Sequence, residues 1–331
     1  MANCPLVSVV IITYNSSEYV LDTLQSAYDQ DYSNIEVVVS DDCSTDNTTE
    51  VVENWFLQNG NHFVRTKLVK TNKNTGIPAN CNRGIINSEG EWIRLVAGDD
   101  LLAPNSIRKQ VEFAQKSGSE AFVGDILNFV EKNGEKVFVG NGQHIDSVPW
   151  FFEWDAQKQY RYLLRHYDLG LGISSLFKRF IYDNITMYDE KYRYEEDTLF
   201  QLNITKGGIC YRYIKEPIMY YRMHESISTA GSSRLMNQKY EDSKWGVRKD
   251  HIYPEIPWYD IIYWETELVE LVIYFLVFYI FGNKNTIINR RIIKILRKCM
   301  LLPYWNRVVN SILRRKWQRR KSKKCGEQKY Y

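Results

Sequence analysis

The chain lacks the cysteine and glycine patterns that mark several large protein classes. Its six cysteines are scattered over 331 residues without a Cys-x-x-Cys pair, and only five histidines are present. No Gly-x-Gly-x-x-Gly follows the first apolar run, and no Gly-x-x-x-x-Gly-Lys-Ser/Thr occurs. These absences argue against a zinc-stabilised fold, a dinucleotide-binding dehydrogenase and a P-loop NTPase.

The chain also lacks a long apolar run and a recognisable leader. Its most apolar stretch, Leu268 to Phe281, is shorter than the ~20 residues of a spanning helix, and Glu270 interrupts it. The N-terminus opens directly into a strand-like run without a basic segment or a cleavage site. We therefore expect no signal peptide and a cytoplasmic location.

Positive charge is concentrated near the C-terminus. Arg290 to Lys324 contains 14 Lys and Arg residues and no acid, which leaves 29 of the 43 basic residues against 40 acidic ones. Residues 287–302 have one apolar face and one basic face, a pattern typical of interfacial helices. We expect this region to bind an anionic membrane surface rather than nucleic acid. The alternative is a helix that packs on the protein with a solvated basic face.

Apolar, β-branched runs alternate with helical segments over the first 118 residues, which predicts a doubly wound α/β sheet with parallel strands. The later pattern predicts a hairpin, an aromatic helix, a strand, a helix entered through three acids, and a last strand followed by a mobile loop. The early strands are expected at 6–13, 35–40, 63–69 and 91–97. The first of the early helices is expected to begin near residue 18, and the others are expected at about 44–58, 78–87 and 104–116. The later elements are expected at 121–139, 149–167, 173–177, 195–205 and 210–221, with the loop at 222–233.

Polar clusters follow three of the predicted strands: Thr13 to Asn15, Asp41-Asp42 and Asp99-Asp100. Ligands of such sheets bind beyond the carboxyl ends of the strands, so the three clusters predict one site. Two adjacent carboxylates suit Mg²⁺ or Mn²⁺, and such an ion can stabilise a departing diphosphate. A helix-capping turn before Pro104 is the alternative for the last pair.

The runs VSVVIITYNSSEYV, IEVVVSDDCSTDNT, NTGIPANCNRGI and GEWIRLVAGDD, followed by YEEDTLF and YYRMHESIS, resemble the family 2 glycosyltransferases with the GT-A fold. The resemblance covers about residues 5–230. It implies an inverting, metal-dependent transferase that moves a hexose from a nucleotide-diphosphate sugar, UDP-linked in our expectation, to a glycan acceptor. The cofactor would be Mn²⁺ or Mg²⁺.

The same resemblance assigns roles to individual positions. Asp197, with Glu196 beside it, would be the general base, and Asp100 and His224 would hold the metal. Ala97 stands where the family has an acid, so the metal prediction rests on Asp100 more than on a bidentate pair. The positions implied to contact the nucleotide-sugar are Thr13, Tyr14, Asn15, Glu18, Asp41, Asn74, Gly76, Asn82, Arg83, Asp99, Ser226 and Ser228.

The chemistry of transfer needs those residue types without reference to any family. A base must take the proton of the acceptor hydroxyl, and the diphosphate must be stabilised as it leaves. The alternatives are an ordinary N-terminal helix acid for Asp197, a surface-loop histidine for His224, and a solvated strand-face charge for Arg222.

The resemblance and the charge distribution together suggest a division of the chain. We expect a GT-A catalytic domain at 1–235, with a nucleotide-sugar half at 1–118 and an acceptor half at 119–235. Residues 236–331 would form a helical, membrane-associating extension. The expected setting is bacterial O-antigen, capsule or exopolysaccharide synthesis on a polyprenyl diphosphate carrier, at the cytoplasmic face of the inner membrane. The rivals are a sugar-nucleotide nucleotidyltransferase and a non-catalytic scaffold that binds membrane or nucleic acid.

Overall fold

The computed structural model describes residues 4–132, 134–141, 148–166, 169–172, 174–223 and 234–327. The chain forms two compact units. The first comprises Met1–Ile145 and Trp154–His224, and the second comprises Asp146–Glu153 and Glu225–Tyr331.

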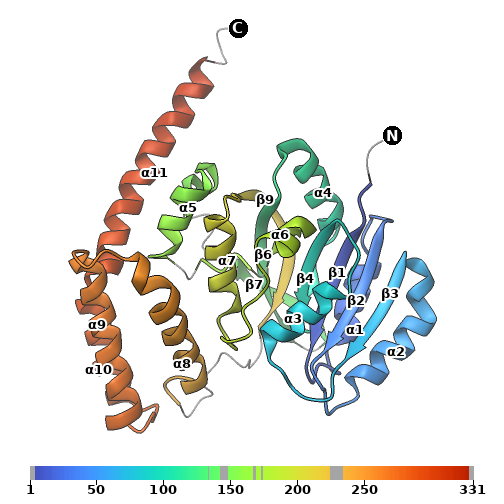
Figure 1. Cartoon of the computed structure of the whole chain (residues 1–331), viewed down its shortest axis with the longest axis horizontal. Coiled ribbons are helices and arrows are strands. Elements are labelled where there is room, and N and C mark those ends of the chain that lie inside the picture. The colour runs from blue at the N-terminus through green and yellow to red at the C-terminus, as the bar shows by residue number, and fades with distance from the viewer. Residues whose placement is uncertain are drawn as a thin grey trace. The chain divides into compact units, whose positions relative to one another are not determined.

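One mixed sheet organises the first unit (Figure 1). Its first four strands are parallel, in the order β3-β2-β1-β4, and the order continues β8-β6-β9-β5 with β7 paired to β6. β8 runs antiparallel to both of its neighbours. The strands are β1 (Val7–Thr13), β2 (Ile35–Asp41), β3 (Arg65–Lys70), β4 (Trp92–Ala97), β5 (Leu101–Leu102), β6 (Ala121–Lys132), β7 (Glu135–Asn141), β8 (Ser175–Lys178) and β9 (Tyr211–Arg222).

Helices cover both faces of the parallel strands. Val9 and Ile11 of β1 belong to one apolar core with residues of α1, α2 and α4. On the opposite face, Gly84 of α3 approaches Val10 so closely that a Cβ at residue 84 would lie 2.5 Å from its Cγ1. Strands enclosed on both faces need continuous apolar runs, which is why β1 and β2 are buried almost throughout. The predicted α/β fold class is confirmed.

Seven α-helices and the 3-10 helix Gly60–His62 of the first unit are described, and α5 refines an expectation. The helical segment predicted for 149–167 is interrupted: a 3-10 helix spans Pro149–Glu153 in the second unit, and Asp155 starts a new helix by accepting a hydrogen bond from the backbone N–H of Lys158 at 2.8 Å. α6 was not predicted. The bounds are α1 (Val20–Tyr28), α2 (Thr48–Asn59), α3 (Ile77–Ile86), α4 (Ser106–Ser117), α5 (Ala156–Leu163), α6 (Arg179–Asn184) and α7 (Glu196–Lys206).

The second unit is helical. Ile273, Val277, Ile293 and Met300 form a small core between α9, α10 and the turn before α11. Asn283, in the left-handed conformation, links the α9–α10 connection to the segment before α8 through bonds with the backbone of Leu235 and Met236. The helices are α8 (Gln238–Val247), α9 (Ile261–Phe275, continued by a π-helical turn at Leu276–Ile280), α10 (Ile287–Cys299) and α11 (Leu301–Glu327).

None of the helices in the described part of the chain is both long enough and apolar enough to cross a membrane. The apolar stretch that Glu270 interrupts lies in α9 and the π-helical turn after it. Several of its side chains are nonetheless exposed, Leu268, Leu271 and Phe275 among them.

Candidate active site

The carboxyl ends of β1 and β2 meet through side chains. Thr13 and Asp41 are register partners, and the Thr13 hydroxyl donates to Asp41 Oδ2 at 2.9 Å. Ser44 donates to the same carboxylate through its hydroxyl and its backbone N–H, at 2.5 and 2.9 Å. The first two polar clusters of the sequence therefore lie together, as their position after neighbouring strands predicts.

The loop after β1 is held over the loop after β2. Asn15 has a φ of 53°, and its side-chain oxygen accepts from the backbone N–H of Thr45 at 2.8 Å. Its own backbone N–H donates to the Ser44 hydroxyl at 2.8 Å. Tyr14 is 42% exposed and Glu18 is also exposed, so both side chains are available to a ligand at this edge.

Asp42 anchors the loop that follows β3. Its carboxylate accepts from the backbone N–H groups of Thr75 and Gly76, and Arg83 pairs with it at 3.0 Å. Burial by itself raises the pKa of Asp42, but these hydrogen bonds outweigh it, and the pKa lies below its ordinary value. Asp42 is therefore ionised and fully engaged in structure.

Two residues predicted to border the nucleotide-sugar hold protein segments together. Asn82, which is buried, donates to the Tyr188 carbonyl at 2.9 Å and accepts from the Tyr188 N–H at 3.0 Å. Asn74 accepts a hydrogen bond from Arg193. Both contacts fix the segment that leads into α7 against the edge that carries the strand-end loops.

Gly76 is needed at that junction for two reasons. Its φ of 96° is unfavourable for other residues, and a Cβ would lie 2.7 Å from the Arg193 Cγ. Glycine therefore lets the Arg193 side chain cross directly over the loop.

Asp99 and Asp100 follow β4 and lie next to the loop after β1. Gly98 packs so closely that a Cβ would come within 2.7 Å of Thr13 Cγ2. Asp100 is only 3% exposed and accepts from the backbone N–H of Arg222 at 2.9 Å. Burial, and then the charge of Asp99, hold the pKa of Asp100 well above its ordinary value.

Arg222, which lies in the run YYRMHESIS, connects the segments of this corner. Its Nε donates to the Asp99 carbonyl at 2.8 Å, and its guanidinium pairs with Asp22 at 2.8 Å and with Glu131. The alternative of a solvated strand-face charge is wrong for Arg222, which is 4% exposed, because three remote segments supply its partners.

The acidic pair is a suitable donor set for a divalent cation. Two adjacent carboxylates repel each other, and burial penalises the charge on Asp100, so a cation would relieve both costs. Within the described ranges, no group of three or more His, Cys, Asp and Glu side chains is arranged to hold a metal ion. His224, Ser226 and Ser228 lie outside the described residues.

Glu196 and Asp197 occupy the first turn of α7. Burial, and then the charge of Asp197, raise the pKa of Glu196 to about 8. Burial, and then the charge of Glu195, raise the pKa of Asp197 to about 6. Both residues are intermediate in exposure, and one carboxyl oxygen of Glu196, Oε2, is buried without a hydrogen-bond partner among the described residues. A carboxylate that titrates near neutral pH is what general base catalysis requires.

The two acids lie beside α3. Burial raises the pKa of the Cys81 thiol well above its usual range, and the charges of Glu196 and Asp197 raise it further. Through α3, the acids are therefore close to the loops that Asn82 and Arg83 hold.

The absence of a side chain at Gly172 leaves space for the Asp197 carboxyl group. A Cβ at residue 172 would fall 2.1 Å from the Asp197 carboxyl carbon. Gly172 and Asp197 are 25 positions apart and share no local sequence pattern, so their contact is known from the structure alone.

Comparison with known proteins gives a consistent result. The family model for glycosyl transferase family 2 matches residues 8–186, more than half of the chain. An uncharacterized glycosyltransferase of Haemophilus influenzae is 23% identical over 76% of this chain and 75% of its own length. The succinoglycan biosynthesis protein ExoO of Rhizobium meliloti is 27% identical over 72% of this chain and 66% of its own length.

A solved structure shares the fold. The crystal structure of S. aureus TarS residues 1–349 in complex with UDP-GlcNAc aligns with a TM-score of 0.57 and 20% identity, over 86% of this chain and 77% of that one.

Proposed function

We propose an activity for this chain, which belongs to glycosyl transferase family 2. It transfers a hexose from a nucleotide-diphosphate sugar to a glycan acceptor, with inversion at the anomeric carbon. The observation that carries the proposal is Asp197, a carboxylate in the first turn of α7 whose pKa is raised to about 6. At pH 7 such a group is mostly ionised, yet it is a stronger base than an ordinary aspartate.

The donor lies at the carboxyl ends of β1, β2 and β4 in this proposal. Tyr14 and Glu18 present exposed side chains for the base or ribose, while Thr13, Asn15 and Asp41 shape the pocket floor. Arg83 and Asp99 border the sugar diphosphate. A UDP-linked donor is supported by the UDP-GlcNAc bound to S. aureus TarS, which shares the fold.

Asp197 takes the proton of the attacking acceptor hydroxyl. Glu196, whose pKa is raised to about 8, keeps its own proton at neutral pH and adds no second negative charge beside that base. Asp100 and His224 would hold Mn²⁺ or Mg²⁺. The bound ion would supply positive charge to the departing diphosphate.

The acceptor in this proposal is lipid-linked, on a polyprenyl diphosphate carrier in surface polysaccharide synthesis. The name of the Rhizobium relative, a succinoglycan biosynthesis protein, supports a polysaccharide product. The basic extension at 236–331 would bring the catalytic unit to the cytoplasmic face of the membrane as a peripheral protein.

A two-part experiment tests the proposal. Thermal shift with a panel of nucleotide-sugars, with and without Mn²⁺, identifies the donor, because a ligand that binds only the folded state raises the melting temperature. Transfer is then assayed with that donor and a lipid-linked acceptor, and the anomeric configuration of the product is read by NMR. Release of pyrophosphate from a nucleoside triphosphate and a sugar phosphate would instead indicate a nucleotidyltransferase and overturn the proposal.

A further inference from the structure

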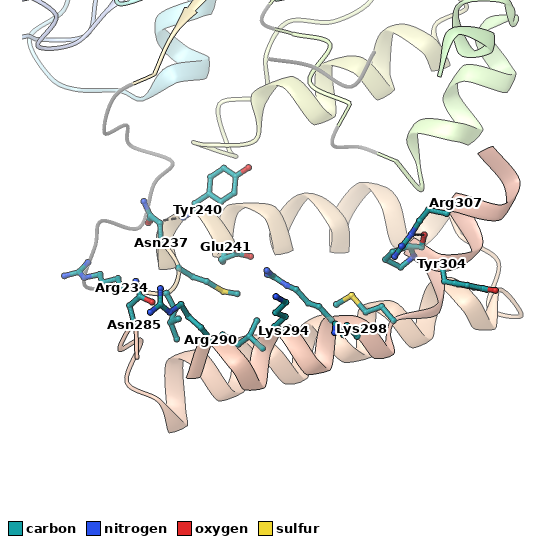
Figure 2. Close-up of a pocket in the computed structure, with 16 residues that line it drawn as sticks. Arg234, Asn237, Tyr240, Glu241, Asn285, Arg290, Lys294, Lys298, Tyr304 and Arg307 are labelled. Atoms are coloured by element: carbon teal, nitrogen blue, oxygen red, sulfur yellow. Dashed lines mark hydrogen bonds between the residues drawn. The ribbon is translucent and has the colours of Figure 1, made fainter. Parts of the chain in front are cut away.

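The second unit contains a cavity of about 790 Å³ that no part of the catalytic account uses. Residues of α8, of α10, of the segment before α8 and of the start of α11 line it (Figure 2). Ligand sites are typically roughly 300–1,000 Å³, so the cavity is large enough for a headgroup-sized molecule. Six of the lining side chains are cationic: Arg234, Arg290, Lys294, Arg297, Lys298 and Arg307.

The helical repeat places most of these cations on one side. Residues 290, 294, 297 and 298 follow the spacing of a single helix face. Figure 2 shows Arg290, Lys294 and Lys298 rising from α10 toward the side where Tyr240 and Glu241 of α8 lie. α10 thus presents a row of positive charge to the cavity.

Little within the protein neutralises that row. Among the described residues that line the cavity, Glu241 is the one acid. Arg297 pairs with Glu270 at 3.8 Å, whereas Arg290, Lys294 and Lys298 form no ion pair with any described residue. Several uncompensated cations around one cavity repel each other, and a polyvalent anion removes that repulsion. Phosphate is the anion that arginine and lysine recognise best.

Exposed apolar side chains accompany the cations. On α10, Ile287, Ile288 and Ile295 are exposed, and at the start of α11 Leu301 and Trp305 are exposed. A free phosphate compound would make no contact with these apolar side chains. A lipid surface would, because its acyl chains lie next to its phosphate groups. Tryptophan and lysine at such positions are typical of membrane interfaces.

We propose that this cavity binds the phosphate groups of anionic lipids, so that α10 and the start of α11 dock on the membrane. The inference rests on the membrane association proposed above and specifies where the contact lies. The cavity makes the main contact with the membrane, and the basic residues of α11 beyond the cavity contribute less to binding.

A charge-matched pair of variants tests the site. The cavity variant carries Arg290→Gln, Lys294→Gln and Lys298→Gln. The control carries Arg315→Gln, Lys316→Gln and Arg320→Gln, which removes the same charge from exposed positions of α11 outside the cavity. The full-length proteins are sedimented with phosphatidylcholine vesicles that contain or lack phosphatidylglycerol, and inorganic pyrophosphate is added as a competitor.

We expect the wild type to sediment with the anionic vesicles only, and the cavity variant to bind them at least about tenfold more weakly. The control should stay within about threefold of wild type. Equal losses in both variants, or an unchanged cavity variant, would overturn the proposal. Binding of pyrophosphate without vesicle binding would overturn the lipid assignment.

Two further measurements separate this inference from other failures. The melting temperature of each variant and a Lys294→Arg variant, expected to bind as wild type, control for folding. Nucleotide-sugar binding should be unchanged in the cavity variant. If the wild type binds neither nucleotide-sugar nor vesicles, the proposed function fails as well. If it binds nucleotide-sugar but not vesicles, only the membrane contact fails.

Discussion

The contact between Gly172 and Asp197 gives a sharp test at the scale of single residues. In Gly172→Ala the new methyl group would overlap the carboxylate and displace it. A displacement of about 1 Å of a catalytic group costs roughly 100-fold in rate. We expect kcat to fall by about that factor with little change in donor affinity. In an Asp197→Asn background the same change should cost almost nothing more, and an additive loss would show that Gly172 acts elsewhere.

The raised pKa of Asp197 also predicts how stability depends on pH, in the direction opposite to that of most acidic residues. Its folded pKa of about 6 exceeds its ordinary value of 3.8, so the folded state binds more protons between these values. Stability is therefore lost as pH rises from about 4 to about 6. Asp197→Asn should raise the melting temperature at pH 7 and flatten its decline over that window. A variant that melts earlier at pH 7 would contradict the raised pKa.

The residues around the acids show what the sequence alone reveals. The positions of Thr13 and Asp41 at the ends of two predicted strands indicated that they lie close together, because the carboxyl ends of parallel strands meet at the same edge of a sheet. The partners of Arg222 come from α1, β6 and the loop after β4, and no local pattern joins those segments. Its burial and the contact of Gly172 with Asp197 depend on tertiary structure, so they could not be predicted.

At the scale of elements, the side chain of Asn82 connects α3 to the segment before α7. Asn82→Ala leaves the buried N–H and carbonyl of Tyr188 without their partner. Unsatisfied buried groups cost roughly 1–3 kcal/mol, so we expect a loss of that size in unfolding free energy, measured by urea denaturation. Asn184→Ala is the matched control, because Asn184 is exposed and its side chain donates to the Phe180 carbonyl in the preceding turn of its own helix. Equal effects would contradict the account.

The elements differ in how far the sequence specifies them. β1, β2, β4 and α3 lie within about two residues of their predicted bounds, since buried strands and apolar periodicity leave strong patterns. The two-residue strand β5 and the short helix α6 contain too few residues to show a hydrophobic periodicity. The helical segment predicted at 149–167 is divided near Asp155, which caps the second helix, and the aromatic pattern alone did not predict that division.

At the scale of the whole molecule, the proposals place catalysis in the first unit and the basic membrane contact in the second. Exposed charges are screened as salt increases, with a Debye length of about 10 Å at 0.1 M and about 3 Å at 1 M. We expect salt to weaken vesicle sedimentation steeply while donor binding, measured by thermal shift, changes little. Vesicle binding that is indifferent to salt would show that the apolar side chains dominate.

Truncation is a poorer test of the same idea. Removing residues 286–331 would take Ile293 and Met300 out of the core they share with Ile273 and Val277. The second unit would lose packing together with charge, so substitution of charges is the cleaner experiment.

The central claim is that Asp197 is the base of a glycosyl transfer. The most direct test is the single-turnover transfer rate of wild type and Asp197→Asn against pH, at saturating donor and metal. We predict that the wild-type rate rises with pH through about 6, as the carboxyl group of Asp197 ionises, and that the variant is slower by at least about 100-fold across the range. A variant that transfers sugar at the wild-type rate, with the same pH profile, would contradict the account.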